Sequence, residues 1–120
     1  MIITLPWPPS ANSIWRAFAQ NGRARSILSK KGREYRSTGI EVARGQFEGG
    51  PLKGRLAVSI TLHAPNRRKF DIDNRVKVAC DTLTRACVWV DDEQIDELHV
   101  YRGEIEKEGR AVIEVRELPI

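Results

Sequence analysis

The 120-residue sequence has no long hydrophobic run, since none of its apolar stretches approaches the roughly 20 residues that a membrane-spanning helix needs. Its first residues also lack the basic segment and cleavage site of a secretory signal peptide. With 41% hydrophobic and 30% charged residues, the composition is typical of a soluble globular protein. We therefore expect one cytoplasmic domain covering residues 1–120, with no membrane association.

Cysteine is scarce, and its two copies, Cys80 and Cys87, fall on one predicted helix. Helical rise would separate them by about 10 Å, which is beyond disulfide reach. The spacing of these cysteines and of His63 and His99 matches no zinc motif. We expect both cysteines to be buried thiols with a structural role.

Acidic residues are rare in the first part of the chain. Residues 1–70 contain 13 Lys and Arg against 3 Asp and Glu, a net charge of +10, whereas residues 71–120 contain 7 against 13, a net charge of −6. A basic segment of this kind favours a polyanionic partner such as a nucleic acid. Unevenly distributed solvated charges produce the same pattern, so charge alone leaves both interpretations open.

Hydrophobic periodicity predicts both strands and helices. Alternation is clearest from Arg55 to His63, where every second residue from Leu56 to Leu62 is a large aliphatic one. An Asn-Gly pair predicts a hairpin between segments 15–18 and 23–28. Further strands are predicted at 2–5, 88–90, 95–102 and 110–118. The predicted helices run from 30 to about 47, with Ser29 as N-cap, and from 73 to about 86, with Asp73 as N-cap.

The central feature of the sequence is a group of carboxylates around the second predicted helix. Crowded carboxylates repel one another unless a cation neutralises them, and Mg²⁺ binds through one or two carboxylates together with water and phosphate. The basic run just before the helix would bind phosphate next to such a metal. The pattern therefore indicates a metal-dependent site that acts on phosphodiesters. The residues concerned are Arg67, Arg68, Lys69, Asp71, Asp73, Lys77, Asp91 and Asp92.

Each acidic residue also has an ordinary structural explanation. Asp73 alone is typical of a helix cap and Asp91-Asp92 of a turn. An EF-hand loop is excluded, because Val76 and Thr82 stand where that loop needs Gly and Glu. P-loop and Gly-x-Gly-x-x-Gly motifs are lacking as well. It is the combination of the carboxylates with the basic run that favours the metal site.

Two further groups of basic residues are candidates for nucleic-acid contact. The predicted hairpin carries Arg16, Arg23 and Arg25. The next helix begins with Lys30 and Lys31, whose charge is unfavourable at a helix N-terminus and so suggests an anionic partner. An ordinary surface hairpin and solvated lysines explain the same residues.

These motifs resemble the RusA Holliday-junction resolvases, a family of small phage-associated endonucleases. The resemblance runs almost end to end, and its most specific part is Asp-x-Asp-Asn-x-x-Lys followed by Asp-Asp at this spacing. Lys69-Phe70 departs from relatives that carry more arginine just before the first aspartate. The segments that carry the resemblance are Leu5–Ser10 with Asn12, Arg67–Asn74 with Lys77, Asp81–Ala86, and Trp89–Gln94.

The resemblance implies an α+β fold, with a mixed β-sheet and about two helices, in a homodimer that requires Mg²⁺ or, in its place, Mn²⁺. It implies that Asp71, Asp73 and Asp92 are the essential metal-binding acids and that Lys77 is the catalytic lysine. Asp91 matches a neighbouring acid whose role the resemblance leaves open. DNA contacts are expected at Arg67, Arg68, Lys69, Arg16, Arg23, Arg25, Lys30 and Lys31.

The expected function is Mg²⁺-dependent cleavage of four-way DNA junctions by paired symmetric nicks in recombination and repair. A non-catalytic basic DNA-binding module with structural carboxylates is an alternative of a different class. A nuclease for flap or linear duplex DNA is a third interpretation. Mg²⁺-dependent nicking of a synthetic four-way junction, with duplex and flap controls, discriminates among the three.

Overall fold

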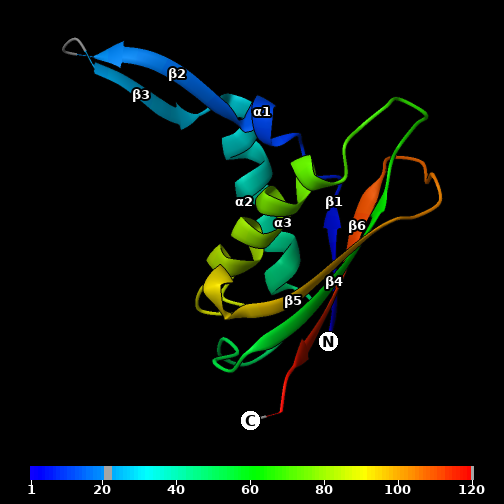
Figure 1. The fold of residues 1–120 in the computed structure, drawn as a ribbon. Helices are drawn as coiled ribbons and strands as arrows, with labels where there is room; N and C mark the ends of the chain where they lie inside the picture. Colours follow the sequence, from blue (N-terminus) through cyan, green and yellow to red (C-terminus); the bar gives the residue numbers. More distant parts are fainter. Residues whose placement is uncertain (21–22, 120) are drawn as a thin grey trace.

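The computed structural model describes the backbone of residues 1–20 and 23–119, with all side chains of these residues except 15–26. Four strands form the main sheet, and a two-stranded hairpin stands apart from it (Figure 1). The strands are β1 (Ile2–Pro6), β2 (Trp15–Gln20), β3 (Arg23–Leu28), β4 (Leu56–His63), β5 (Ile95–Arg102) and β6 (Arg110–Glu117). The helices are α1 (Ala11–Ile14), α2 (Lys30–Arg44), α3 (Asp73–Arg85) and the 3₁₀ turn η1 (Asp92–Gln94).

The main sheet is mixed and has the order β1-β6-β4-β5. Strand β6 runs antiparallel to both β1 and β4, whereas β5 runs parallel to β4. A parallel pair needs a long crossover connection, which α3 provides between β4 and β5. Figure 1 shows α2 and α3 together on one face of the sheet. The predicted α+β class is confirmed, with one more short helix than expected.

The hydrophobic core lies between the sheet and the helices. The alternation predicted for β4 is confirmed, because Leu56, Val58, Ile60 and Leu62 are fully buried. Each such side chain contributes roughly 1.5–3 kcal/mol of burial free energy. The other main members of the core come from β1, α3, the segment after α3, and β6: Ile3, Leu5, Ala79, Leu83, Val88, Trp89, Ala111, Ile113 and Val115.

Two glycines explain how α2 packs so closely against its neighbours. Their presence weakens a helix prediction from sequence, since glycine is a poor helix former. A Cβ at Gly32 would lie 2.7 Å from the Ile14 carbonyl oxygen, and one at Gly39 would lie 2.7 Å from Thr82 Cγ2. The two positions therefore permit the contacts of α2 with α1 and α3.

The start of α2 agrees with the prediction, whereas that of α3 does not. The Ser29 hydroxyl oxygen accepts a hydrogen bond from Gly32 N–H at 3.1 Å, as expected of an N-cap. The N-cap of α3 is Ile72, which makes no side-chain capping bond. Asp73 instead begins the first turn, where its charge is favourable for the helix dipole. The prediction of Asp73 as the cap was wrong.

Two other local predictions differ from the structure. Segment 88–90 is not a strand and contributes only one isolated bridge, between Leu52 and Trp89. Helix α2 ends at Arg44, short of 47, and residues 11–14 form the single turn α1, which the predicted helices did not include. The hairpin of β2 and β3 is confirmed and extends away from the body of the molecule in Figure 1. Its predicted Asn21-Gly22 turn lies outside the described residues.

The cysteines differ from each other. Both are free, as predicted, but only Cys80 is buried, and burial raises the pKa of its thiol to about 12. Cys87 is exposed and has a φ of 63°. The Val88 N–H donates to Leu83 O at 3.1 Å, and the Cys87 N–H donates to Thr84 O at 3.0 Å. This is a Schellman-type helix end, and it turns Cys87 outward, contrary to the prediction.

The helices that the structure describes include none with the length and apolar character needed to cross a bilayer.

Candidate metal centre and nucleic-acid interface

The predicted acids come from opposite ends of α3. Because β5 runs parallel to β4, the chain returns along α3 before β5 begins. The 13 residues of α3 span about 20 Å at 1.5 Å per residue. Asp73 stands at the start of this helix, and Asp92 stands beyond its end, in η1. Lys77 lies one turn into α3, between the two.

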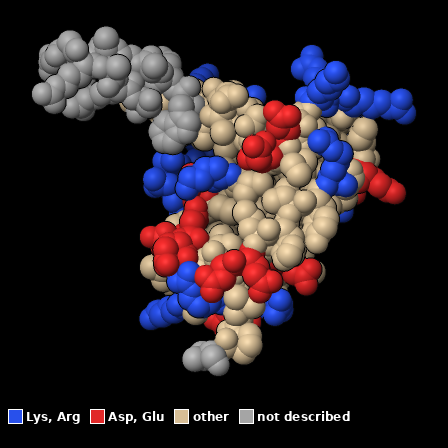
Figure 2. Space-filling model, in the orientation of Figure 1, with Lys and Arg blue, Asp and Glu red and all other residues tan. Residues whose placement is uncertain are grey.

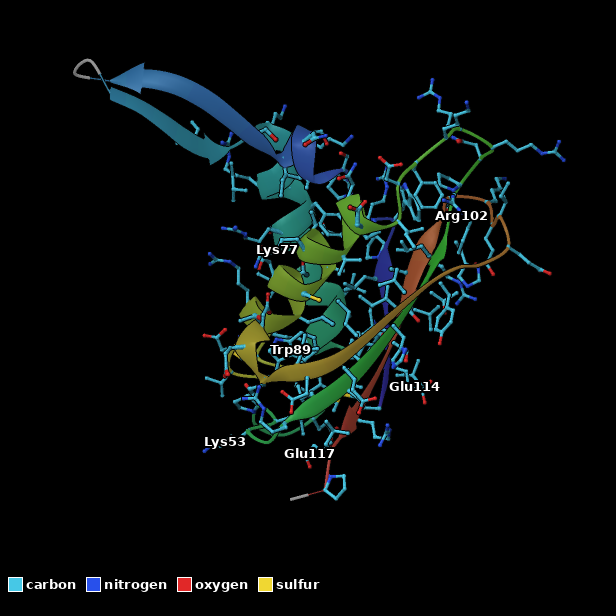
Figure 3. All side chains as sticks on the ribbon, in the orientation of Figure 1. Lys53, Lys77, Trp89, Arg102, Glu114 and Glu117 are labelled. Atoms are coloured by element: carbon cyan, nitrogen blue, oxygen red, sulfur yellow. The ribbon has the colours of Figure 1, made fainter. Side chains whose placement is uncertain are left out.

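A single groove connects Asp73, Lys77 and Asp92. It has a volume of about 560 Å³ and runs between α3 and β5. Figure 3 shows Lys77 and Trp89 on the helical side of the sheet. Three carboxylates and one ammonium group line the groove, because Asp96 joins the predicted residues. Its remaining lining is apolar: Ile72, Val76, Cys80, Ile95, Leu98 and Val100.

The Asp92 carboxylate is held firmly on one side. Its Oδ1 accepts hydrogen bonds from the Thr84 hydroxyl and, at 3.1 Å, from the indole Nε1 of the fully buried Trp89. The same indole N–H lies 2.6 Å from Thr84 Oγ1. Burial acts to raise the pKa of Asp92, but hydrogen bonds from Thr84, Trp89 and Lys77 outweigh it and hold the pKa below its usual value. Asp92 is therefore ionised, with Oδ2 on the side of Lys77.

Lys77 bridges two carboxylates along this groove. Its Nζ lies 2.9 Å from Asp81 Oδ1 and 3.2 Å from Asp92 Oδ2. The hydrogen bond to Asp81 is the main cause of the raised pKa of Lys77, against partial burial and with help from Asp92. The side chain is 69% exposed, so the ammonium group remains accessible from solvent. Asp73 stands four residues before Lys77, but the Lys77 side chain pairs with acids toward the C-terminal end of the helix.

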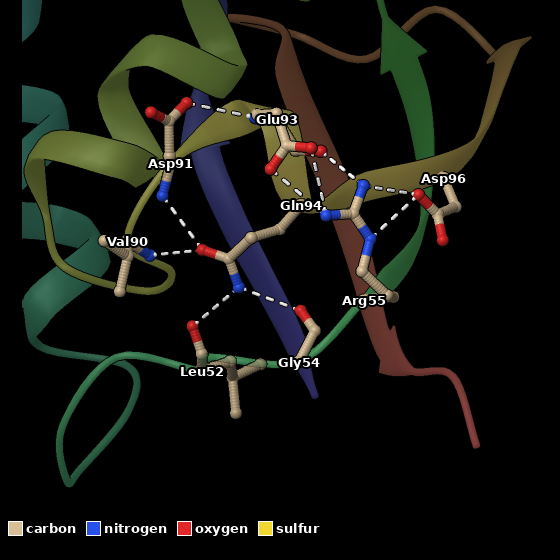
Figure 4. Close-up of polar contacts among 8 residues, drawn as sticks. All are labelled: Leu52, Gly54, Arg55, Val90, Asp91, Glu93, Gln94 and Asp96. Atoms are coloured by element: carbon tan, nitrogen blue, oxygen red, sulfur yellow. Dashed lines mark hydrogen bonds and ion pairs between the residues drawn. The ribbon is translucent and has the colours of Figure 1, made fainter. Parts of the chain in front are cut away.

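The turn that presents Asp92 is fixed by Gln94, which is buried (Figure 4). Its Oε1 accepts hydrogen bonds from the backbone N–H groups of Val90 and Asp91, at 2.8 and 2.9 Å. Its Nε2 donates to the carbonyl oxygens of Leu52 and Gly54, at 2.9 Å each. All four bonds go to the backbone, so one side chain joins the turn to the segment before β4.

Two ion pairs of Arg55 support the same turn on its exposed side. Arg55 Nη1 lies 3.1 Å from Glu93 Oε2, and Arg55 Nη2 lies 2.6 Å from Asp96 Oδ1. Arg55 Nη2 also donates to Glu93 O at 2.6 Å. Figure 4 shows the guanidinium group between the two acidic side chains.

Asp91 and Asp71 stand outside this groove. Asp91 caps η1, since its side chain accepts from Glu93 N–H at 3.0 Å and its own N–H is bound by Gln94. Asp71 is exposed in the turn before α3. It lines a separate hollow of about 320 Å³ with Ser10, Lys69, Phe70, Asn74 and Arg75.

The donor set of the groove fits a hard divalent cation. Mg²⁺ is usually bound by one or two carboxylates, with water and substrate phosphate in its other positions. Asp73 and Asp92 supply two carboxylates on one groove. The described residues contain no group of three or more His, Cys, Asp or Glu side chains that would enclose an ion without further ligands. The described carboxylates therefore do not form a complete metal site by themselves, and a cation bound there would need further ligands from water or phosphate.

The predicted basic residues fall into two places. Arg67, Arg68 and Lys69 are all exposed on the loop between β4 and α3. Figure 2 shows Lys and Arg side chains projecting from this loop, and Asp and Glu gathered lower on the same face. Lys31 of α2 lines one hollow together with Arg68 and Lys69, whereas Lys30 is exposed and lies 3.9 Å from Glu34. Arg16, Arg23 and Arg25 lie on β2 and β3, and their side chains are outside the described part of the structure.

Comparison with known proteins gives this arrangement a family. The profile of the family described as Endodeoxyribonuclease RusA matches residues 6–116. The chain belongs to the RusA family. Relatives named crossover junction endodeoxyribonuclease RusA, from Enterobacteria phage 82, Shigella sonnei strain Ss046 and Escherichia coli strain K12, are each 34% identical to it over 116 residues. These matches cover 97% of this chain and 93% of each relative. The resemblance seen in the sequence is confirmed.

Three residues that support the groove were not among the predicted site residues. Thr84, Trp89 and Gln94 lie inside the resembling segments, but a role beside Asp92 was not predicted for them. A buried indole needs a hydrogen-bond acceptor, and Asp92 is the acid three residues beyond Trp89. That pairing was one signal available from the sequence, and the capping-box pattern Asp91-x-x-Gln94 was another. The bonds of Gln94 to Leu52 and Gly54 had no local signal, because these residues lie about 40 positions away.

Proposed function

We propose that this protein is a Mg²⁺-dependent endodeoxyribonuclease that resolves four-way DNA junctions in recombination and repair. The observation that carries the proposal is the groove shared by Asp73, Lys77 and Asp92, close to the exposed basic loop, in a chain of the RusA family. The names of the relatives specify crossover junctions as what those proteins cut. A non-catalytic DNA-binding module has no need for an ionised carboxylate held at the side of a solvent-accessible groove.

In this proposal Asp71, Asp73 and Asp92 are the metal-binding acids; Asp73 and Asp92 line the groove, whereas Asp71 lines a separate hollow in the protein without DNA. Mg²⁺, or Mn²⁺ in its place, supplies activation of a water molecule and stabilisation of charge on the phosphate oxygens. Thr84 and Trp89 hold Oδ1 of Asp92, which leaves Oδ2 for the groove. The Lys77 ammonium group neutralises charge that develops on the phosphate. The products are a 5′-phosphate and a 3′-hydroxyl.

We further propose that the active form is a homodimer. Paired nicks on opposed strands require two active sites, and a twofold dimer matches the symmetry of the junction. Strand β5 lies at one edge of the main sheet and carries the exposed Leu98 and Tyr101 on its two faces, which supports a protein contact along this edge. Trp89 is 0% exposed and belongs to the core, so its side chain is not part of such a contact. Sedimentation should give a mass near twice 13.6 kDa.

A panel of synthetic DNA substrates tests the function. We expect nicks at symmetric positions in a four-way junction with Mg²⁺, none with EDTA, and no cutting of linear duplex or flap DNA of the same sequence. Binding without cutting in Mg²⁺ or Mn²⁺ would favour the DNA-binding module. Cutting of duplex or flap DNA at a comparable rate would favour the less selective nuclease.

Salt dependence tests the proposed DNA contacts of the basic loop. Replacement of Arg67 and Arg68 together by Ala should weaken junction binding. It should also lower the slope of log affinity against log salt by about 0.9 for each phosphate that the variant no longer neutralises. An unchanged slope would remove both arginines from the interface.

A further inference from the structure

A hollow beside the basic loop combines aromatic with cationic side chains. Its volume is about 630 Å³, within the range of about 300–1,000 Å³ that is usual for pockets holding small molecules. Trp7, Tyr35 and Phe70 supply aromatic surface. Four basic side chains face one acidic side chain in its lining: Lys31, Arg68, Lys69 and Arg75 against Glu34. The pocket therefore suits a ligand that is flat at one end and anionic at the other.

Arg75 is held inside this pocket by aromatic rings. Its guanidinium carbon lies 4.7 Å from the ring centroid of Trp7 and 5.6 Å from that of Phe70. These two rings pack edge to face, with centroids 5.1 Å apart. Arg75 Nη1 donates to Pro8 O, which fixes the side chain to the segment after β1.

The charge of Arg75 has no anionic partner among the described residues, since none of their ion pairs includes it. Its Nε is buried without a hydrogen-bond partner, and burial lowers the pKa of the guanidinium group. A partly buried cation without a carboxylate is costly to hold unless an anion joins it. Cation–π contacts with the two rings offset part of that cost.

The pocket opens toward the acidic site. Lys69, Phe70 and Arg75 line both this pocket and the smaller hollow that contains Asp71. Arg102, the last residue of β5, lies over the Phe70 ring, with its guanidinium carbon 4.1 Å from the ring centroid. Figure 3 shows Arg102 at the far end of β5, beside the loop that joins β4 to α3. A DNA strand with one phosphate at Asp71 would therefore place a neighbouring nucleotide beside the aromatic rings of Trp7 and Phe70.

We propose that this pocket binds one unpaired nucleotide of the DNA, with its base against Trp7 and Phe70 and its phosphate near Arg75 and Lys69. Aromatic rings stack on any base, and basic side chains beside them follow the backbone, so this combination is usual for single-stranded DNA. Extrusion of a nucleotide costs least where stacking and pairing are already disturbed, as at the exchange point of a junction. The pocket would therefore favour branched over linear DNA. This inference rests on the proposed function.

Photo-crosslinking tests the position of the base directly. Junctions with 5-iodouracil at each position near the exchange point are bound in EDTA, so that no strand is cut, and then irradiated. We expect one register to crosslink to a peptide containing Phe70 or Trp7, and the matching linear duplex to give no such product. A crosslink to the Phe70 peptide should disappear in Phe70→Leu and persist in Phe70→Tyr. Bound junctions that crosslink at no position to these peptides, or duplexes that crosslink equally, would overturn the proposal.

Affinity measurements give a second readout that does not need cleavage. Loss of base stacking in Phe70→Leu should weaken junction binding roughly 5- to 150-fold and leave duplex binding unchanged. The slope against salt should not change, because no charge is removed. Phe47→Leu is the matched control, since Phe47 lines a different hollow past the opposite end of α2. An equal loss of affinity for junction and for duplex DNA in Phe70→Leu would overturn the proposal.

The two proposals fail in different ways. If the protein crosslinks through Phe70 but does not cut junctions in Mg²⁺, the pocket proposal stands and the proposed function is wrong. If the unsubstituted protein gives no crosslink and Phe70→Leu cuts junctions normally, the proposed function stands and the pocket proposal is wrong. Thermal unfolding of each variant confirms that it is folded before either result is interpreted.

Discussion

Asp92 and Asp71 lie at opposite ends of α3, and their surroundings differ in almost every respect. Asp92 is partly buried, receives two hydrogen bonds on one oxygen, and has Lys77 at the other. Asp71 is exposed, in a turn next to a basic and aromatic loop. One carboxylate is therefore positioned before any ligand arrives, whereas the other is open to adjust when DNA binds. If the proposed function is correct, Asp92 is preformed for its role, whereas Asp71 takes its final position only with DNA bound.

The largest effects should come from the carboxylates themselves. Asp71→Asn and Asp92→Asn should each lower junction cleavage by more than about 100-fold, beyond the roughly 10–100-fold typical of groups that only support a metal ligand. Only Asp92→Asn should also lower the free energy of unfolding, by about 1–2 kcal/mol, because the Asp92 side chain has hydrogen-bond partners in the protein. Single-turnover cleavage and urea unfolding measure the two quantities. Near-normal turnover by folded Asp71→Asn would remove Asp71 from the site.

The next effect concerns the support of Asp92. Trp89→Phe keeps a buried ring but removes the N–H group that bonds Thr84 and Asp92. We expect cleavage to fall about 10–100-fold and the Mg²⁺ concentration for half-maximal rate to rise. If cleavage and Mg²⁺ dependence both stay unchanged, Trp89 serves only the core.

A smaller effect is expected from the turn that carries Asp92. Gln94→Glu removes both N–H donors to Leu52 and Gly54 and places a carboxylate against their carbonyl oxygens, so stability should fall by about 2 kcal/mol. Gln46→Glu is the matched control. Gln46 also bonds backbone groups, at Thr4 N–H (2.7 Å) and Thr4 O (2.6 Å), but it is exposed, so its loss should cost under about 1 kcal/mol. Equal losses would contradict a special role for the Gln94 turn.

The lowered pKa of Asp92 predicts a modest pH dependence of stability. The carboxylate stabilises the fold fully above its ordinary pKa of about 3.9, and this contribution is lost as the pH falls through the lower folded value. Asp92→Asn should therefore lose less stability than the unsubstituted protein between pH 5 and pH 2. Urea unfolding at a series of pH values measures this, and parallel curves for the two proteins would contradict it.

The smallest effect is expected at Asp91. Asparagine is as good an N-cap as aspartate, so Asp91→Asn should preserve the cap of η1 and change stability by less than about 0.5 kcal/mol. Cleavage should also stay within about threefold, because the Asp91 side chain caps η1 instead of lining the groove. A loss beyond 100-fold would show that Asp91 binds the metal.

The sequence by itself determined the features that depend on near neighbours. The alternation of β4, the Ser29 cap and the position of the acidic motif at a helix start all follow from side chains within about four residues of one another. The family could also be read from the sequence, because its motif joins residue types at set spacings. The misassigned Asp73 cap shows the limit of such reasoning, since two helix starts one residue apart have nearly the same local signals.

Only the tertiary structure decided how the site is assembled. The parallel pairing of β4 with β5 makes α3 a crossover, and this separates Asp73 from Asp92 by the length of a groove. The pairing of β1 and β4 on either side of β6 brings the ends of these strands together, and with them Trp7 against Phe70 and Arg75. Gly32 and Gly39, unfavourable in a helix considered alone, are required by the close approach of α2 to its neighbours. Contacts between residues far apart in the chain leave no periodic trace in it, because they are selected by the packing of whole elements.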